Sequence, residues 1–460
     1  MRLVRDGFRW ELQPGFAPVL EALLQDPGVV VKESPAKRVT RHDLGDRTYY
    51  VKAYRHEAVP LRPLKFLVAR PAPRREWENA RRLESLGIPV VRHLAHGERW
   101  RLGLRESLLV TEGFAGRPLE EVPGLDPAPA LALVEQLHRH GVHHSDLHSG
   151  NLLADPATGE LRLVDIDKLR FGTGRPGDPG ARDEMLAFLN ISFPLPLPPA
   201  VRALSARRRR ELLADRSWRC LRHNREFAPV RAGGLRWQAR TPLLSPDAQR
   251  VLADPDAFLA SAARSLKQGQ STTVGARHGL VLKRFNRRGP LHLLKDLARA
   301  SRARRGFRKA YHLELAGVPT ARVVAAAERR PLGLLLRSYL LMEELPDTVM
   351  LRRHLRDGHR PDPALLRALA RLVARLHDEG FTHGDLNERN LLLNPAGQVF
   401  LIDLDALTHA GVVPGDAAAR DLGRLAADMA RHPQVTPADL RAFLRAYCRA
   451  RHLRRVPRSR

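Results

Sequence analysis

Residues 144–151 read HSDLHSGN, and residues 383–390 read HGDLNERN. Each octet keeps a histidine, an Asp-Leu pair and a closing asparagine at the same spacing, and a run of leucines follows each one. Polar loops framed by apolar segments are common places for catalytic and binding residues. The repetition raises the question of whether the chain contains two copies of one domain.

Further landmarks repeat outside the octets and keep the same order in both halves. A fixed order with drifting offsets is what a duplication followed by loop insertions produces. The sequence therefore predicts two tandem domains, residues 1–230 and 231–460. The matched pairs are GFRW (7–10) with GLRW (234–237), TYYVKAY (48–54) with LVLKRF (280–285), and REWENARRLESLGIPV (75–90) with RGFRKAYHLELAGVPT (305–320).

The composition limits the classes of protein to consider. At 460 residues the chain is longer than a single core usually grows, which agrees with two domains. It has no apolar run long enough for a membrane span, and its N-terminus, MRLVRDGFRWEL, lacks the apolar stretch of a secretory signal. Cys220 and Cys448 lie far apart and fit no metal-binding spacing. We therefore expect a cytoplasmic protein without disulfides or structural zinc.

The formal net charge of +28 has two interpretations, and both stay open. It can reflect a bias toward arginine, with the arginines solvated on helix faces, or a surface that meets polyanions. The arginine run at 206–211 has no interleaved aromatic residues, so we expect no specific nucleic-acid binding. An anionic lipid surface would instead place the protein peripherally at the inner membrane.

The periodicity of each half predicts an α+β domain. Short strand-like runs come first, then an arginine-rich helix that ends at Gly87 or Gly317, then strands that end near residues 112 and 344. An amphipathic helix closed by glycine leads into each octet, and two apolar runs around a turn follow it as a hairpin. Each octet is therefore expected on a loop between packed elements.

Carboxylates, an amide and a lysine recur at matching places in the two halves. In the first half Asn151 follows Asp146 by five residues, Asp165 ends the apolar run LVDID, and Lys52 lies upstream on a strand-like segment. Two carboxylates and an amide on adjacent loop ends suit a hard divalent cation. An Asp that does not bind the cation can accept a hydroxyl proton, and the lysine can hold nucleotide phosphates. The set therefore suits γ-phosphoryl transfer. The counterparts in the second half are Asp385, Asn390, Asp403 and Lys283.

Lysine is rare in this chain, yet most of the lysines are paired by the repeat. Arginine differs from lysine in shape and hydration, so a site that needs a compact ammonium beside a phosphate retains lysine. We expect that role for Lys52 and Lys283. Both a ligand role and a surface role remain open for two further pairs, Lys32 with Lys267 and Lys65 with Lys295.

The motif HxDLxxxN, followed by a strand ending in Asp and preceded by a strand lysine, resembles the protein-kinase-like superfamily. The finer pattern is similar to the lipopolysaccharide core kinases, which phosphorylate Kdo or heptose sugars: HGDLNERN, LIDLD in place of DFG, and LGIPV or AGVPT after the arginine-rich helix. The resemblance covers nearly the whole chain, once in each half. It implies two tandem protein-kinase-like domains, each with a small β-rich N-lobe and a mainly helical C-lobe.

The resemblance also implies ATP and Mg²⁺ or Mn²⁺ as cofactors, together with roles for the site residues. Asp146 and Asp385 become catalytic bases, and Lys52 and Lys283 bind the ATP phosphates. Glu76 is expected to pair with Lys52. The implied metal ligands are Asn151, Asp165, Asn390 and Asp403.

The second half departs from the family pattern at one position. Gly306 stands where the first half has Glu76, so Lys283 has no obvious partner, and we expect the chemistry to depend more on the first half. The family resemblance places Asp183 and Asp421 where an Asp braces the catalytic loop. Structural roles are expected for His144 and His383, whereas surface and supporting roles both remain open for Asp167 and Asp405.

Both halves lack the GxGxxG loop of protein kinases and a clear APE ending, which weakens a protein-kinase interpretation. The predicted function is ATP-dependent transfer of the γ-phosphoryl group to a hydroxyl of a lipopolysaccharide core sugar or related glycolipid. The alternatives are a kinase of the same fold acting on protein Ser/Thr or on a small molecule, and a partly non-catalytic ATP-binding scaffold.

Overall fold

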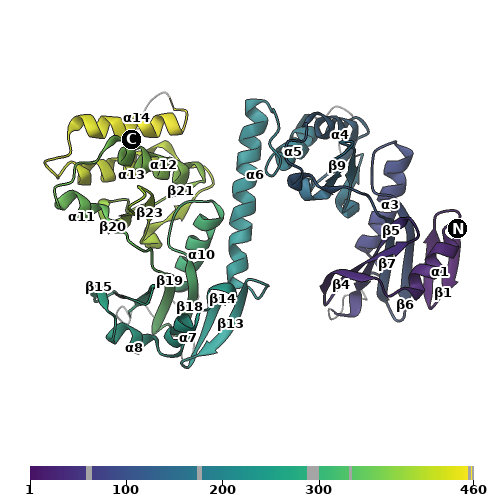
Figure 1. Ribbon diagram of the computed structural model, residues 1–460, viewed down its shortest axis with the longest axis horizontal. Helices are drawn as coiled ribbons and strands as arrows, with labels where there is room; N and C mark the ends of the chain where they lie inside the picture. The colour runs from purple at the N-terminus through teal and green to yellow at the C-terminus, as the bar shows by residue number, and fades with distance from the viewer. Residues whose placement is uncertain (59–64, 173–178, 287–299, 331–333, 454–456, 458–460) are drawn as a thin grey trace. The chain divides into compact units, whose positions relative to one another are not determined.

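The computed structural model (Figure 1) describes residues 1–58, 65–172, 179–286, 300–330, 334–453 and 457. The chain divides into two compact units, Met1–Arg209 and Arg210–Arg460. This division falls inside helix α6 (Pro199–Ser217). The boundary expected between residues 230 and 231 lies within strand β13 (Phe227–Ala232), so we propose that the junction between the copies precedes this strand.

In the first unit, seven described strands form an antiparallel sheet in the order β1-β2-β6-β7-β5-β4-β3. Alternate residues of β2, Phe8, Trp10 and Leu12, are buried and pack with Leu20 and Leu23 of helix α1 (Ala17–Gln25). This alternation is the pattern of a sheet whose face is covered by a helix. The strands are β1 (Arg2–Arg5), β2 (Phe8–Leu12), β3 (Val29–Ser34), β4 (Lys37–Leu44), β5 (Arg47–Arg55), β6 (His93–Trp100) and β7 (Leu104–Glu112).

The second unit repeats this sheet, with seven described strands in the order β13-β14-β18-β19-β17-β16-β15. Replacing each strand by its counterpart converts one order into the other, so the duplication extends to the topology. Helices α7 (Pro246–Ala253) and α8 (Pro255–Ala260) occupy the place that α1 has in the first unit. The remaining strands are β14 (Leu235–Arg240), β15 (Arg264–Gly269), β16 (Thr272–Arg277), β17 (Leu280–Phe285), β18 (Val323–Arg329) and β19 (Arg337–Glu343).

The helical lobe of the first unit follows helix α3 (Ala72–Ser85), which packs against β6 and β7. The first octet lies between β9 and β10, as the sequence predicts. The helices are α4 (Ala128–Arg139) and α5 (Pro179–Leu189), and the short strands are β8 (Arg117–Pro118), β9 (Val142–His144), β10 (Leu152–Ala154), β11 (Leu161–Leu163) and β12 (Leu169–Phe171). The single 3₁₀ turns are η1 (His56–Ala58), η2 (Leu119–Glu121), η3 (Ser149–Asn151) and η4 (Ile166–Lys168).

The helical lobe of the second unit has the same plan and larger helices. Helix α14 begins with a capping box, because Thr436 and Asp439 each satisfy the other's backbone N–H. The helices are α10 (Arg302–Leu315), α11 (Leu351–Arg356), α12 (Pro363–Asp378), α13 (Gly415–Met429) and α14 (Pro437–Ala450). The short elements are β20 (Val349–Met350), β21 (Phe381–Thr382), β22 (Leu391–Leu393), β23 (Val399–Leu401), β24 (Thr408–His409), η5 (Trp218–Leu221), η6 (Thr241–Leu243), η8 (Glu388–Asn390) and η9 (Leu404–Ala406).

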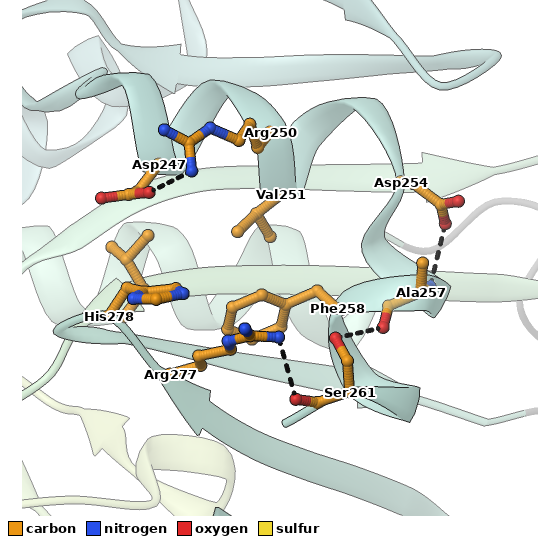
Figure 2. A pocket seen from close by; sticks show the side chains of 10 residues that line it. Asp247, Arg250, Val251, Asp254, Ala257, Phe258, Ser261, Arg277 and His278 are labelled. Carbon is orange, nitrogen blue, oxygen red and sulfur yellow. Dashed lines mark hydrogen bonds and ion pairs between the residues drawn. The ribbon is translucent and has the colours of Figure 1, made fainter. Parts of the chain in front are cut away.

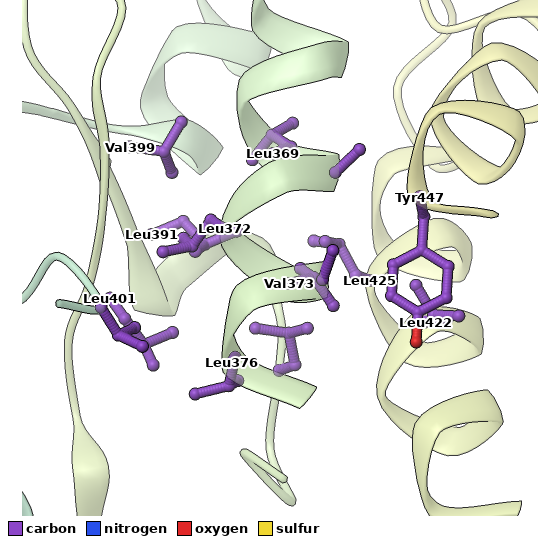
Figure 3. Close-up of a cluster of buried hydrophobic side chains, with 14 of the residues drawn as sticks. Leu369, Leu372, Val373, Leu376, Leu391, Val399, Leu401, Leu422, Leu425 and Tyr447 are labelled. Carbon is purple, nitrogen blue, oxygen red and sulfur yellow. The ribbon is translucent and has the colours of Figure 1, made fainter. Parts of the chain in front are cut away.

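Helix α12 lies at the centre of the second unit's helical core (Figure 3). Leu369, Leu372 and Leu376 recur at helical spacing, so one helix can pack against the hairpin β22–β23 and against α13 and α14. Truncating one such buried leucine to alanine typically costs about 2–5 kcal/mol. This core fixes the octet between α12 and the hairpin. Its other labelled members are Val373, Leu391, Val399, Leu401, Leu422, Leu425 and Tyr447.

The predicted fold class is confirmed, because each unit joins an antiparallel sheet lobe to a mainly helical lobe. In each unit an isolated parallel bridge connects the segment after the long helix to the hairpin strand that precedes the predicted Asp. The bridges are Val90–Leu163 and Thr320–Leu401. Within the described chain, every helix is too short or too polar to cross a membrane.

Candidate active site

The first unit contains the expected lysine–glutamate pair. Lys52 lies on β5 opposite Val39 and Leu109, and its Nζ lies 2.6 Å from Oε1 of Glu76 on α3. The Glu76 side chain is 1% exposed and also lies 3.3 Å from Nε2 of His93. Burial alone would raise the pKa of Glu76, but Lys52 and His93 outweigh it and hold that pKa well below the usual range. The pair is therefore held in its charged form.

Lys52 is also coupled to the Asp at the end of the hairpin. Burial would lower the pKa of Lys52, but Glu76 outweighs that effect, and the charges of Asp165 and Asp167 add to it, so the pKa is raised. Asp167 itself accepts a hydrogen bond from Arg75 at 3.0 Å and has a pKa raised mainly by burial. Asp167 is thus tied to α3 by an ion pair.

In the second unit the matching lysine has different partners. Nζ of Lys283 lies 2.7 Å from Oδ1 of Asp403 and 3.2 Å from Oδ2 of Asp405. Gly306 provides no carboxylate, and a Cβ added there would lie 3.1 Å from Cδ2 of Leu340. Burial would raise the pKa of Asp403, but Lys283 and, more weakly, Lys267 outweigh it, so that pKa is lowered. Lys283 is therefore paired with the acids of the hairpin end instead of a helix glutamate.

The two octets fold in the same way around their asparagines. Nδ2 of Asn151 donates to the backbone oxygen of Asp146 at 2.9 Å, and Nδ2 of Asn390 donates to that of Asp385 at 2.8 Å. These bonds fix each amide with its oxygen available to a ligand, because the nitrogen is already committed. The equal geometry in both units follows from the equal spacing in the sequence.

Asp165 and Asp403 both adopt the left-handed backbone conformation, with φ, ψ of 57°, 48° and 56°, 67°. This conformation is uncommon for residues other than glycine and costs of order 1–3 kcal/mol, so it persists where the surroundings impose it. Each Asp comes directly after the hairpin, at the point where the backbone turns into a 3₁₀ segment. The two units thus carry the same strained carboxylate at the position predicted to bind metal.

Each octet aspartate has a cationic partner that the sequence did not reveal. Nζ of Lys168 lies 2.5 Å from Oδ2 of Asp146, and Nη1 of Arg424 lies 2.7 Å from Oδ1 of Asp385. Asp146 is the main cause that raises the pKa of Lys168. Lys168 comes from η4 and Arg424 from α13, so the two units reach a similar charge arrangement from unrelated positions. The signal available in the sequence was a lysine three residues after Asp165.

The brace expected for the octet is present in the second unit. Asp421 on α13 accepts hydrogen bonds from the backbone N–H groups of His383 at 2.7 Å and Gly384 at 3.0 Å, and lies 3.3 Å from Nε2 of His377. Burial would raise the pKa of Asp421, but these bonds outweigh it and lower that pKa. The expectation for Asp421 is confirmed.

The expectation that Asp183 braces the first octet is wrong. Its side chain is 35% exposed and lies beside Arg182, whereas the N–H of His144 points to Sδ of Met185 at 3.4 Å. Helix α5 therefore presents a thioether where α13 presents a carboxylate. The ARD motif matched in sequence, but the helix is placed so that a residue two positions later faces the loop.

Both octet histidines are buried in structural positions. Burial lowers the pKa of His144 to about 4, and it also lowers the pKa of His383. Nδ1 of His144 accepts from the N–H of Asp146 at 3.2 Å, and Nε2 of His383 lies 3.3 Å from the backbone oxygen of Ile402. Neutral, buried imidazoles of this kind orient the loop, in line with the sequence prediction.

The two lysine pairs whose role the sequence left open differ in their positions in the structure. Lys32 and Lys267 lie opposite Val39 and Val274, the residues that also pair with the two strand lysines, so both are near the sites. Lys65 is exposed, and Lys295 lies outside the described residues. A lysine that the repeat does not pair, Lys37, stacks over the ring of Tyr54 at 4.8 Å.

The donor set fits a hard cation held partly by a nucleotide. Among the described residues, no three His, Cys, Asp or Glu side chains cluster as a self-sufficient metal site. Mg²⁺ is commonly held by one or two carboxylates together with substrate phosphates. The site offers the carboxylate of Asp165 and the amide oxygen of Asn151. These oxygen ligands suit Mg²⁺ better than they suit zinc.

A separate cavity of about 270 Å³ lies on the sheet lobe of the second unit (Figure 2). Residues of α7, α8 and the turn between β16 and β17 line it, and Arg277 there donates to the backbone oxygen of Ser261 at 3.2 Å. Asp247 and Arg250 form an ion pair at its edge. None of its described lining residues belongs to the predicted site.

Comparison with known proteins places the chain in a family. The sequence model of the Lipopolysaccharide kinase (Kdo/WaaP) family matches residues 21–120 and 260–447, together more than half of the chain. The first match ends before the first octet, whereas the second match includes the second octet. The family pattern therefore covers strands β3 to β7 of the first unit's sheet lobe and, in the second unit, strands β15 to β19 and the helical lobe.

Curated relatives agree with this match. Lipopolysaccharide core heptose(I) kinase WaaP of Pseudomonas aeruginosa is 32% identical over 216 residues, 42% of this chain and 80% of the relative. A 3-deoxy-D-manno-octulosonic acid kinase of Xylella fastidiosa is 31% identical over 145 residues, 30% of this chain and 57% of the relative, so the chain spans little more than half of that protein. The structure of WaaP in complex with acyl carrier protein matches 45% of this chain and 93% of its own, at 24% identity and a TM-score of 0.31. The chain belongs to the lipopolysaccharide kinase (Kdo/WaaP) family.

Proposed function

We propose that this protein is an ATP-dependent kinase that transfers the γ-phosphoryl group to a hydroxyl of a lipopolysaccharide core sugar, Kdo or heptose, or of a related glycolipid. The observation that carries the proposal is the buried Lys52–Glu76 pair at 2.6 Å, coupled to Asp165 in the unit that also contains Asp146. Family membership and the names of the two relatives support the acceptor class.

The side chains of the first unit divide the work of phosphoryl transfer. Lys52, held by Glu76, would bind the α- and β-phosphates of ATP, and Asp146 would accept the proton of the acceptor hydroxyl. Asn151 and Asp165 would hold Mg²⁺ or Mn²⁺, which neutralises charge on the phosphates. In the second unit we assign the same roles to Lys283, Asp385, Asn390 and Asp403. Positioning and electrostatic stabilisation supply most of the catalysis in such a reaction.

We also propose a cytoplasmic location with peripheral contact to the inner membrane. The net charge of +28 gives a strongly basic surface, and anionic lipid attracts such surfaces. An acceptor carried by a glycolipid would lie at that same surface.

The test uses the full-length protein with labelled ATP, Mg²⁺ and lipopolysaccharide cores prepared without phosphate. Label in the core is the expected result. Folded protein that labels no core sugar, while it phosphorylates a protein or a small sugar, would replace this proposal by the alternative kinase functions.

A partly non-catalytic second unit is the other candidate. The observation that favours it is that Lys283 pairs with Asp403 at 2.7 Å and Gly306 offers no helix glutamate. Single variants of Asp146 and Asp385 decide between the two, as described in the Discussion.

A further inference from the structure

A cavity of about 600 Å³ opens beside Asp385 in the second unit. Lys283, Asn390 and Asp403 are not among its described lining residues, so it is separate from the region expected to hold the phosphates and metal. We take it as the acceptor side of the predicted base, because Asp385 lines it and the residues expected to hold phosphates and metal do not. The arginines among its described lining residues are Arg352, Arg356, Arg389, Arg424 and Arg431, against the acids Asp385, Glu388 and Asp428.

The acids of the cavity are already paired. Asp385 lies 2.7 Å from Arg424, and Asp428 lies 3.1 Å from Arg431. Glu388 is shared, with one oxygen 2.7 Å from Nε2 of His432 and the other 3.5 Å from Nε of Arg352. The lining thus has more cationic groups than the acids can neutralise.

Two arginines in the cavity have uncommitted guanidinium groups. Within the described part of the chain, the side chains of Arg356 and Arg389 form no ion pair or hydrogen bond, although both residues line the cavity. Arginine offers five N–H donors in a planar fork that matches a phosphate or carboxylate. A cavity with two such forks next to a catalytic base is suited to an anionic acceptor.

The first unit differs at the same positions. The pairing of β8 with β10 and of β20 with β22 aligns Glu120 with Arg352, and the octets align Gly150 with Arg389. A carboxylate replaces a cation at the first of these positions, where Oε2 of Glu120 accepts from Oγ of Ser149 at 2.5 Å. The acceptor side of the first unit therefore carries an acid where the second unit carries an arginine.

We propose that the second unit binds an acceptor through an anionic group, a phosphate or a carboxylate, held by Arg356 and Arg389, and that the first unit takes an acceptor that is uncharged at the corresponding place. The inference rests on the proposed kinase function and names the acceptor class of each copy. In the second unit Asp385 takes the hydroxyl proton, the hydroxyl oxygen bonds to the γ-phosphorus, and the bond to the bridging oxygen of ADP breaks. The two copies then phosphorylate different acceptors.

Binding without ATP tests the inference independently of turnover. Calorimetry with the full-length protein compares a phosphorylated core oligosaccharide, the same oligosaccharide after removal of its phosphates, free Kdo as the carboxylate probe, and inorganic phosphate. The variants are Arg356→Gln and Arg389→Gln. The matched control is Arg353→Gln, on the same helix, because its side chain is 79% exposed, pairs with Asp357 at 3.6 Å and does not line the cavity.

We expect each cavity variant to weaken binding of the phosphorylated oligosaccharide about tenfold, the usual order for one charged hydrogen-bonding group, with no change in the control. Tighter binding of the phosphorylated oligosaccharide assigns a phosphate; binding of Kdo that Arg389→Gln weakens assigns a carboxylate. The inference would be overturned if the phosphorylated and dephosphorylated oligosaccharides bound with equal affinity and Arg389→Gln left the affinity for Kdo unchanged. It would also be overturned if the cavity variants and the control changed the affinities equally.

Transfer assays in an Asp146→Asn background separate this inference from the proposed function. There the cavity variants should raise the KM for the anionic acceptor about tenfold and leave the KM for ATP unchanged. If the anion binds through these arginines but no acceptor is labelled by the unmodified protein, the proposed function fails and the binding inference stands. If label is transferred and the arginine variants change neither affinity nor KM, the inference fails and the function stands.

Discussion

Nζ of Lys52 lies 2.6 Å from Oε1 of Glu76, on a carboxylate that is 1% exposed. A buried lysine without its partner would be left as an uncompensated charge, and the partner's loss typically costs about 3–5 kcal/mol. We therefore predict that Glu76→Gln lowers the turnover of the first unit by about a hundredfold, since it frees Lys52 from its position at the phosphates. The measurement is kcat/KM for ATP in an Asp385→Asn background, which isolates that unit.

Glu78 supplies the control for this variant. It lies on the same helix, two residues on, and its ion pairs within the described residues, with Arg70 and Arg74, are exposed. Such pairs contribute about 0–1 kcal/mol, so Glu78→Gln should leave turnover within about twofold. Equal losses in the two variants would mean that α3 matters as a whole and the Lys52 pair does not.

Lys168 and Asp146 form a second pair whose role is open to test. The ammonium lies 2.5 Å from Oδ2 of Asp146 and so next to the place where the γ-phosphoryl group would be transferred. We predict that Lys168→Met lowers kcat of the first unit about tenfold or more and changes the KM for the acceptor little, because the cation stabilises charge that develops during transfer. Lys168→Arg should restore part of kcat. A variant with unchanged kcat and raised KM would assign Lys168 to acceptor binding instead.

Much of the fold could be predicted, because the information was local and repeated. The octets, the hairpins and the lysine strands recur in the same order in both halves. Each half therefore gives a separate sequence pattern that predicts the same fold. The Lys52–Glu76 pair was expected from the family resemblance, and the loop position of each octet was expected from the apolar elements on either side of it. The hydrogen bond from Asn151 to the backbone oxygen of Asp146 was not predicted. The αL conformation of Asp165 was not predicted, because nothing in LVDID distinguishes it from other hairpin ends.

The features that were missed depend on how helices are placed. Arg424 reaches Asp385 from α13, and no sequence distance predicts that contact. Asp183 was assigned by motif, but α5 turns Met185 toward the octet, so a match in sequence did not become a match in space. The cavity arginines come from α11, the octet, α13 and the segment just after α13, and they gather only after those elements pack.

The second unit should lose stability in mild acid. Burial between Phe381 and His409 lowers the pKa of His312 to about 3, against about 6.5 in the unfolded chain. Below pH 6.5 the unfolded state therefore binds a proton that the folded state excludes, and stability falls by up to about 1.4 kcal/mol per pH unit toward pH 3. Urea unfolding of the full chain at pH 7.5 and pH 5.0 measures the loss. His312→Phe keeps the ring packing and should reduce that pH dependence; an unchanged dependence would exclude His312 as its source.

Peripheral membrane contact should depend on salt. Screening shortens the reach of surface charge from about 10 Å at 0.1 M salt to about 3 Å at 1 M, so a protein held by a +28 charge should leave anionic vesicles as salt rises. Sedimentation with vesicles that contain anionic lipid, and with neutral vesicles as the control, measures the bound fraction. Protein that stays bound at 1 M salt, or that binds both kinds of vesicle equally, would rule out a purely electrostatic contact.

The two units should contribute unequally to total turnover. The first holds the lysine–glutamate pair, whereas Lys283 is held by Asp403 and Asp405 and must leave them for a nucleotide and metal to be bound in the same way. The second has the braced loop, because Asp421 bonds His383 and Gly384. The braced octet cannot compensate for Lys283 if that lysine does not bind the phosphates. Phosphoryl transfer depends on positioning at both ends of the phosphate chain.

We therefore predict that Asp146→Asn and Asp165→Asn each remove most of the phosphate transfer, about a hundredfold in the first unit's own rate, whereas Asp385→Asn leaves a substantial part of the total. The transfer that survives in Asp146→Asn should go to the anionic acceptor, because only the second unit then acts. The measurement is label transfer by all three variants under one set of substrates, with the acceptor separated by charge. An inactive Asp385→Asn beside an active Asp146→Asn would reverse the assignment. In that case the braced loop of the second unit decides activity, and Lys283 binds ATP without a helix glutamate.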